Sequence, residues 1–185
     1  MEKKINQRVA LTKRLVHEGL LRLLEKEPVE SINVSELCRE AGINRATFYK
    51  HYYSPHDVLA EIESNFVMEL DAAQFSVVPK EVSTHVTRLE GLCSYLKNNS
   101  KTVTLLVKSK MDSDLSKIFE NFPNDVVKVF ERNIRFDDKQ KHLVTRFLSF
   151  GLYGLIIRWI IEDIPLTPRE VALLIDDLSK GGWLI

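Results

Sequence analysis

One short stretch of the chain carries side chains suited to contact with a polyanion. Residues 41–56 hold two basic residues and two histidines but no aspartate or glutamate. The guanidinium of Arg45 can donate two hydrogen bonds to a guanine, and Thr47 can offer a hydroxyl to a base or a methyl to thymine. Hydroxyl, ammonium and imidazole groups suit phosphate oxygens. The stretch supplies these groups at Tyr49, Lys50 and His51. It is therefore the candidate site for nucleic-acid contact.

Residues that could support catalysis or hold a metal do not gather into known patterns. The five histidines are scattered, and Cys38 and Cys93 are isolated from each other. The chain has no glycine-rich phosphate loop and no Cys/His spacing typical of a metal site. No serine or cysteine lies in a recognisable nucleophile motif. We therefore expect a protein that is not an enzyme, with no catalytic residue, no metal and no cofactor.

Three helices are predicted to position the candidate site. Apolar residues spaced three and four apart predict a first helix over 5–24. Asn33 is a suitable N-cap for a short second helix, which ends at Gly42 because glycine tolerates a left-handed conformation. Asn44 can cap a third helix that runs through Tyr49. A tight glycine turn between two short helices is typical of a helix-turn-helix, whose second helix enters the major groove of DNA.

Three motifs in this region follow a specific order. They are Ala41-Gly42-Ile43 at the turn, Thr47-Phe48-Tyr49 in the third helix and His51-Tyr52 before the next helix. In this order they resemble the signature of TetR-type transcriptional regulators, and the resemblance covers about residues 8–66. It implies DNA contacts for the positions of Thr47, Tyr49 and His51, and a phosphate contact for Ser35. The predicted DNA-contacting residues are Ser35, Asn44, Arg45, Thr47, Tyr49, Lys50, His51 and His56.

The sequence departs from this family at Pro55. The family usually has lysine there, and that lysine touches the DNA backbone at the start of the fourth helix. Proline cannot make this contact, so we expect His56 or the N-terminus of the fourth helix to replace it. That helix is predicted to begin at the capping box Ser54-Pro55-His56-Asp57. The basic residues between Lys3 and Arg14 form either a solvated helix face or a flexible arm on DNA.

The rest of the chain is also predicted to be helical, with Val77-Val78-Pro79 interrupting the pattern. About five further helices are expected, one of them over 115–130. We predict an all-α fold with an N-terminal three-helix helix-turn-helix DNA-binding domain and a C-terminal helical ligand-binding and dimerisation domain. The expected organisation is a DNA-binding domain at 1–56, a connector helix at 57–78 and a regulatory and dimerisation domain at 79–185.

The helix predicted over 137–162 is apolar over most of its circumference and must be covered on more than one side. It and the last helix, which begins at Thr167-Pro168-Arg169-Glu170, could pair with their two-fold mates in a four-helix bundle. The resemblance likewise implies a homodimer formed by the last two helices. A monomer whose own core buries both apolar stripes is the alternative. The expected dimerisation residues are Phe150, Gly151, Gly154, Ile157, Trp159, Ile161, Val171, Leu174, Ile175 and Leu178.

The resemblance implies a sequence-specific transcriptional regulator of double-stranded DNA. We expect a homodimeric repressor that binds a palindromic operator and is released by a small-molecule effector. An activator of the same fold and an adaptor that acts through a protein partner remain alternatives. The sequence names no effector. The candidate residues for an effector pocket are His85, Tyr95, Met111, Phe119, Phe122, Phe147 and Tyr153.

Composition limits the remaining possibilities. The chain has 185 residues, of which 44 % are hydrophobic, and 26 basic residues balance 26 acidic ones. This length can bury a core without disulfide or metal support. The longest apolar stretch, over 152–161, is interrupted by Arg158 and is shorter than the roughly 20 residues that span a bilayer. The charged first twenty residues do not resemble a signal peptide. We therefore expect a cytoplasmic protein without membrane contact.

Overall fold

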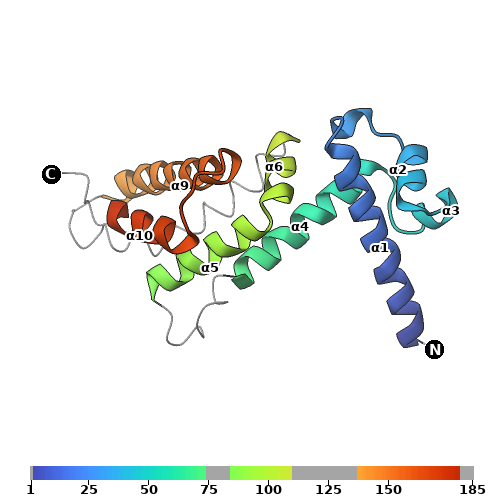
Figure 1. Ribbon diagram of the computed structural model, residues 1–185, viewed down its shortest axis with the longest axis horizontal. Helices are drawn as coiled ribbons and strands as arrows, with labels where there is room; N and C mark the ends of the chain where they lie inside the picture. Colours follow the sequence, from blue (N-terminus) through green and yellow to red (C-terminus); the bar gives the residue numbers. More distant parts are fainter. Residues whose placement is uncertain (1, 74–83, 110–136, 180–185) are drawn as a thin grey trace. The chain divides into compact units, whose positions relative to one another are not determined.

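The structure is a computed structural model that describes residues 2–73, 84–109 and 137–179. All regular elements within these residues are helices (Figure 1). The chain divides into two compact units. Unit 1 comprises Met1–Phe66 and Leu105–Lys110, and unit 2 comprises Val67–Thr104 and Met111–Ile185. The boundary at Phe66 lies within the segment 57–78 that was predicted as the connector. The prediction of an all-α fold is confirmed for the described residues.

Unit 1 holds the N-terminal helices. They are α1 (Glu2–Leu24), the 3₁₀ turn η1 (Val29–Ser31), α2 (Val34–Ala41), α3 (Arg45–Phe48) and the first part of α4 (Pro55–Ala73). α1 packs against α2, and α2 contacts α3. A Cβ atom on Gly19 would lie 3.2 Å from Cβ of Ala41, so the absence of a side chain at Gly19 allows α1 and α2 to approach closely. The core is apolar, and its fully buried side chains include Val16, Leu20, Leu37, Phe48 and Leu59.

The predicted helix boundaries of unit 1 depend on local signals that the structure confirms. Asn33 Oδ1 accepts a hydrogen bond from Glu36 N at 3.0 Å and caps α2. Gly42 ends α2 with φ +67°, the left-handed conformation expected of a glycine there. Asn44 caps α3, which ends at Phe48, one residue before the predicted end. The basic N-terminal residues belong to α1, so the structure supports a helix face and not a flexible arm.

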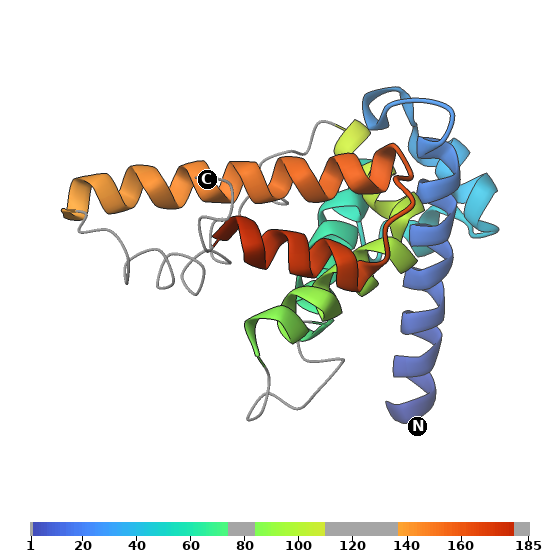
Figure 2. The same ribbon diagram turned by 60° about the vertical axis from the view of Figure 1, so that its left-hand side comes forward.

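Unit 2 is built around α5. It contains the end of α4, α5 (His85–Asn98), the first part of α6 (Ser100–Lys108), α9 (Asp138–Ile161) and α10 (Pro168–Ser179). α10 packs along α5, and α9 also contacts α5. α9 is the long helix in Figure 2, and a short loop leads from its end into α10. The core of unit 2 includes the fully buried Leu89, Leu92, Cys93, Ile156 and Val171.

Polar contacts join the elements of unit 2. Arg169 on α10 forms an ion pair with Glu90 on α5 at 3.0 Å, and Lys97 on α5 pairs with Asp163 after α9 at 2.6 Å. The indole N–H of Trp159 donates to the carbonyl of Leu166, so the loop after α9 is tied back to that helix. The predicted helix over 115–130 and the predicted break at Val77-Val78-Pro79 lie outside the described residues.

One helix among the described residues could cross a membrane as judged by length and composition. It is the stretch His142–Ile161 within α9. The expectation that no stretch is long enough is therefore wrong for this helix, because the stretch is long and apolar enough even with both Arg146 and Arg158 inside it. The core helix of a soluble protein passes the same test. α9 contributes Leu152, Ile156 and Trp159 to the core of unit 2.

Candidate nucleic-acid interface

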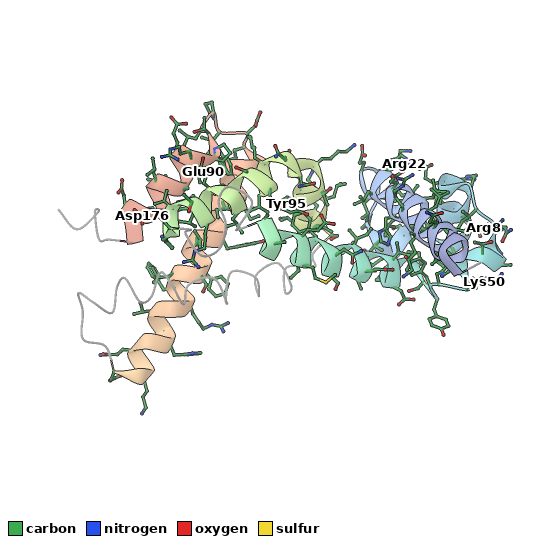
Figure 3. The ribbon with its side chains drawn as sticks, turned by 90° about the horizontal axis from the view of Figure 1, so that it is seen from below. Arg8, Arg22, Lys50, Glu90, Tyr95 and Asp176 are labelled. Carbon is green, nitrogen blue, oxygen red and sulfur yellow. The ribbon has the colours of Figure 1, made fainter. Side chains whose placement is uncertain are left out.

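The candidate site is the segment that begins with α3. Asn44 Oδ1 accepts a hydrogen bond from Thr47 N at 2.7 Å, which stabilises the first turn of this four-residue helix. Phe48 is fully buried and Tyr52 is 4 % exposed, so both rings anchor the segment in unit 1. Between them, Tyr49 is 54 % exposed. Lys50, labelled in Figure 3, is also exposed. The segment thus presents a tyrosine and a lysine to solvent on a firmly anchored backbone.

Arg45 and Ser35, two predicted contact residues, meet in the structure. The Arg45 guanidinium donates a hydrogen bond to Ser35 Oγ, which joins the start of α3 to α2. Burial raises the pKa of the Cys38 thiol on α2, and the nearby Arg45 charge acts in the opposite direction. The Ser35 oxygen is the acceptor, so its own O–H can still donate to a phosphate. The pair therefore places a cation and a hydroxyl together at the face of α2 and α3.

The start of α4, where His56 or the helix N-terminus was predicted to bind phosphate in place of a lysine, carries an acidic side chain. Asp57 accepts hydrogen bonds from the backbone N–H groups of Tyr53 and Ser54 at 2.8 and 2.9 Å. These bonds lower the pKa of the Asp57 carboxyl. A carboxylate at this helix end already satisfies backbone donors and repels a phosphate. His56 is exposed on the first turn and remains the candidate for this contact.

Tyr53 is an exposed aromatic residue that the sequence prediction missed. Its side chain is 87 % exposed, the highest value among the exposed large hydrophobic residues described. Its backbone is held by the bond to Asp57, four residues later in the chain. The tyrosine pair at 52–53 could have signalled this arrangement, because adjacent side chains before a helix rarely share one core position. Tyr53 thus adds an exposed hydroxyl a few residues after Tyr49.

The predicted dimerisation residues fall into three groups, which are exposed, half-buried and buried. Phe150, Ile161 and Leu174 are 55 %, 41 % and 42 % exposed. Gly151 is also exposed, whereas Gly154 and Leu178 are half-buried. Four others are corrected to the protomer's own core, because each is at most 8 % exposed. These four are Ile157, Trp159, Val171 and Ile175.

Further apolar side chains on α9 and α10 are exposed but were not among the predicted dimerisation residues. Leu143 on α9 and Leu173 on α10 are 68 % and 43 % exposed. The Arg146 guanidinium lies 5.8 Å from the centre of the Phe150 ring. The exposed side chains of α9 and α10 that we call the apolar face are Leu143, Phe147, Phe150, Ile161, Leu173 and Leu174. Exposed apolar surfaces that are contiguous and large mark interaction sites, so this face is the candidate interface of unit 2.

The four predicted pocket residues that the structure describes lie in different surroundings. Phe147 is 69 % exposed and therefore is corrected to the surface. Met111, Phe119 and Phe122 lie outside the described residues. Tyr153 is half-buried.

The other two pocket candidates take part in side-chain contacts. His85 Nδ1 lies 3.3 Å from Asp176 Oδ1, an α5–α10 contact whose acidic partner is labelled in Figure 3. The Tyr95 hydroxyl donates to Glu69 at 2.7 Å. Burial and this hydrogen bond raise the pKa of Tyr95. Within the part of the chain that the structure describes, no three His, Cys, Asp or Glu side chains are grouped to hold a metal.

The fold and this site define a class of protein. Three N-terminal helices with a glycine turn and a capped, solvent-facing third helix form a helix-turn-helix unit, which is followed by a helical unit. Residues 87–181, just over half of the chain, match a TetR family model described as a transcriptional regulator C-terminal region. The chain belongs to the TetR family of transcriptional regulators. A family of regulators agrees with the prediction that the chain is not an enzyme.

Individual proteins also resemble the chain. It is 32 % identical over 84 residues to the uncharacterized HTH-type transcriptional regulator YxbF of Bacillus subtilis (strain 168), a match that spans 44 % of this chain and 22 % of the relative. A TetR transcriptional regulator from Streptococcus agalactiae 2603V has a similar structure, with TM-score 0.73, 16 % identity and coverage of 97 % and 99 % of the two chains. The dihydroxyacetone kinase operon activator DhaS matches with TM-score 0.64 and 19 % identity, over 92 % of this chain and 95 % of that one.

Proposed function

We propose that this protein is a homodimeric regulator that reads a palindromic DNA operator through α3 and the turn that follows it. The observation that carries the proposal is the exposed Arg45, Tyr49 and Lys50 on a segment anchored by Phe48 and Tyr52. A residue that reads DNA must be exposed while its backbone is held rigidly. Family membership supports the same function, because the family consists of transcriptional regulators.

Roles differ among the proposed contacts. Thr47 and Arg45 are proposed to read base edges, since these side chain types discriminate between bases in the major groove. Tyr49, Lys50, His51, His56 and Ser35 are proposed to contact phosphates and to set the register of the protein on DNA. Asn44 is proposed to act chiefly as the cap of α3, because its side-chain oxygen is bonded to Thr47 N.

A homodimer is proposed because one short helix reads only a few base pairs. Two copies can read successive major grooves about 34–36 Å apart, which requires a two-fold interface. The apolar face of α9 and α10 supports this assembly, since Phe150 and Leu174 are exposed on it. We further propose that the protein is cytoplasmic and does not enter the membrane, because α9 divides its apolar residues between the core of unit 2 and this face.

Repression and a small-molecule effector are proposed on the family resemblance. His85 is the candidate effector contact in unit 2, because its Nε2 atom is buried and has no hydrogen-bond partner among the described residues. DhaS, whose structure is similar, is an operon activator, so activation remains the alternative. A transcription assay separates these alternatives once an operator has been obtained by DNA selection and placed over a promoter. A decrease in transcript indicates repression, and an increase indicates activation.

The experiment that tests the DNA-binding proposal is selection of random duplex DNA by the purified full-length protein, followed by sequencing. We expect a two-fold symmetric site whose half-sites lie about one helical turn apart. Tyr49→Ala should weaken binding to all sequences. Arg45→Ala or Thr47→Ala should also relax preference at one half-site position, by about 1–3 kcal/mol.

The control variant is Lys139→Ala, which removes an exposed cation on α9 outside the candidate interface. Specific binding by this variant should match that of the wild-type protein. Retention of no particular sequence, with weak binding that collapses as salt increases, would contradict the operator proposal and favour the adaptor. Wild-type affinity in all three variants of the α3 segment would contradict the assignment of this segment.

A further inference from the structure

Tyr52 and three side chains from α1 and α4 come together in unit 1. Lys13 Nζ on α1 lies 2.8 Å from Glu61 Oε1 on α4, and it also lies 5.6 Å from the centre of the Tyr52 ring. His17 Nε2 is 3.1 Å from the Tyr52 hydroxyl and 3.7 Å from Glu61 Oε2. We call these residues, which come from α1, α4 and the turn between α3 and α4, the Tyr52 cluster.

The chemistry of the cluster assigns a direction to its hydrogen bonds. Burial, and then a hydrogen bond to Glu61, raise the pKa of Tyr52, so its hydroxyl is a donor at neutral pH. Partial burial acts to raise the pKa of Glu61, but hydrogen bonds from Lys13 and Tyr52 hold it below its usual value. The Tyr52 hydroxyl lies 3.1 Å from His17 Nε2, and because an ionised carboxylate only accepts, Tyr52 is the donor in its interaction with Glu61. The buried hydroxyl therefore has two polar neighbours, His17 and Glu61, and losing either interaction weakens the hold on the Tyr52 ring.

Aromatic contacts connect the cluster to the proposed DNA-contacting residues. The Tyr52 ring lies 5.7 Å from the Phe48 ring, and Phe48 meets Tyr49 edge-on at the same distance. The His51 ring lies 6.4 Å from that of Tyr52. Ring centres at 4.5–7 Å are in favourable contact. The position of the Tyr52 ring therefore affects Tyr49, which is exposed, and His51, which is half-buried. Both side chains are proposed above to contact phosphates.

We propose that Glu61 and the Tyr52 hydroxyl are positioning groups for the DNA-contacting turn. Together they hold the Tyr52 ring against Phe48, and thereby hold Tyr49 and His51 in the geometry that binds an operator. Glu61 itself lies on α4 and is bonded to α1, so its role is indirect. This inference rests on the proposed DNA-binding function, because the operator is the ligand whose binding it explains. The ordering of the turn itself can be measured on the free protein.

Two near-isosteric variants test the proposal. Tyr52→Phe removes only the hydroxyl, and Glu61→Gln removes only the charge. Each should lower affinity for the selected operator by about tenfold, while affinity for random DNA changes little. The double variant should bind no more weakly than the weaker single variant, because the two groups act through one contact. Binding is measured at a temperature where circular dichroism shows every variant folded.

Hydrogen exchange on the free protein supplies a second readout. The amides of Tyr49, His51 and Tyr52 donate to carbonyls within α3. Their exchange should be about tenfold faster in Tyr52→Phe and Glu61→Gln, whereas amides in the middle of α1 keep their protection. General destabilisation would instead speed exchange in α1 as well.

Glu40→Gln is the matched control. It removes the charge of another partly exposed ion pair of unit 1, between Arg22 on α1 and Glu40 on α2, away from the Tyr52 cluster. This variant should retain wild-type operator affinity and wild-type exchange. Unchanged exchange in the turn of both test variants would overturn the positioning role, whether or not DNA is bound. A wild-type protein that selects no operator, with faster exchange in both variants, would instead contradict the proposed function and leave the positioning role supported.

Discussion

Aromatic residues from Phe48 to Tyr53 are divided between two environments. Phe48 and Tyr52 are buried, whereas Tyr49 and Tyr53 are 54 % and 87 % exposed. A buried aromatic ring contributes much of the core contact of a small domain. The two buried rings therefore account for the stability of the turn. The two exposed tyrosines gain no such burial within the protomer, which is consistent with contact to a partner such as DNA.

The pH dependence of unit 1 should report on His17. Burial lowers the pKa of His17 from 6.5, although Glu61 partly opposes this effect. The unfolded chain therefore binds a proton at a higher pH than the folded chain does. Stability is at its full value above about pH 6.5 and falls as pH decreases through the lowered folded pKa. Thermal melts between about pH 8 and pH 5.5 should show this loss.

His17→Gln should flatten that part of the pH profile, because glutamine does not titrate. If the wild-type slope survives in His17→Gln, the pH dependence belongs to other groups.

Helix ends decide how α2 and α3 are placed. Asn33 and Asn44 each satisfy a backbone donor at the start of a helix, and Gly42 lets the chain turn sharply between them. The Arg45–Ser35 hydrogen bond adds a side-chain link between the same two helices. Because α3 is only four residues long, its conformation depends on these contacts more than on its own helix propensity.

Gly42→Ala should destabilise unit 1 by about 1 kcal/mol, since a Cβ atom disfavours φ +67°. A Cβ at this position meets nothing within 4 Å, so the expected effect comes from the backbone and not from a clash. Gly42→Asn is the matched control, because asparagine tolerates the left-handed region and should recover part of the loss. Urea unfolding measures both variants. Equal stability of Gly42→Ala and wild type would contradict the conformational argument.

The whole molecule combines the unit proposed to contact DNA with a unit that carries the apolar face. Phe147 and Phe150 on α9 and Leu174 on α10 are well exposed on unit 2. Singly scattered apolar residues are normal on a surface, but neighbouring ones on one helix indicate a partner. The proposed partner is a second copy, which supplies the second recognition segment that an operator requires.

Phe150→Glu and Leu174→Glu should convert the proposed dimer into monomers, because each places a charge within an apolar interface. Sedimentation equilibrium measures the mass, and affinity for the full operator should fall toward that for one half-site. Met68→Glu is the control, because Met68 is 60 % exposed on α4 and lies outside the apolar face. Dimers that persist in both test variants would contradict this interface.

Much of the local structure could be predicted from the sequence. The caps at Asn33 and Asn44 and the glycine turn at Gly42 were identified correctly. Each depends on residues that are close in the chain, so the physical signal is local. The predicted DNA-contacting residues stay a prediction, but the exposure of Arg45 and Tyr49 is consistent with it.

The sequence by itself determined the helical class, the helix-turn-helix order and the family resemblance, because periodicity, caps and motif spacing are properties of neighbouring residues. Only the tertiary structure decided which apolar residues of α9 and α10 face inward. Trp159 and Val171 are buried while Phe150 and Leu174 are exposed, although all four lie on predicted apolar stripes. The Tyr52 cluster also required the fold, because Lys13 and Glu61 are 48 residues apart in the chain. A periodic pattern identifies an apolar face, but only packing against distant elements determines what covers it.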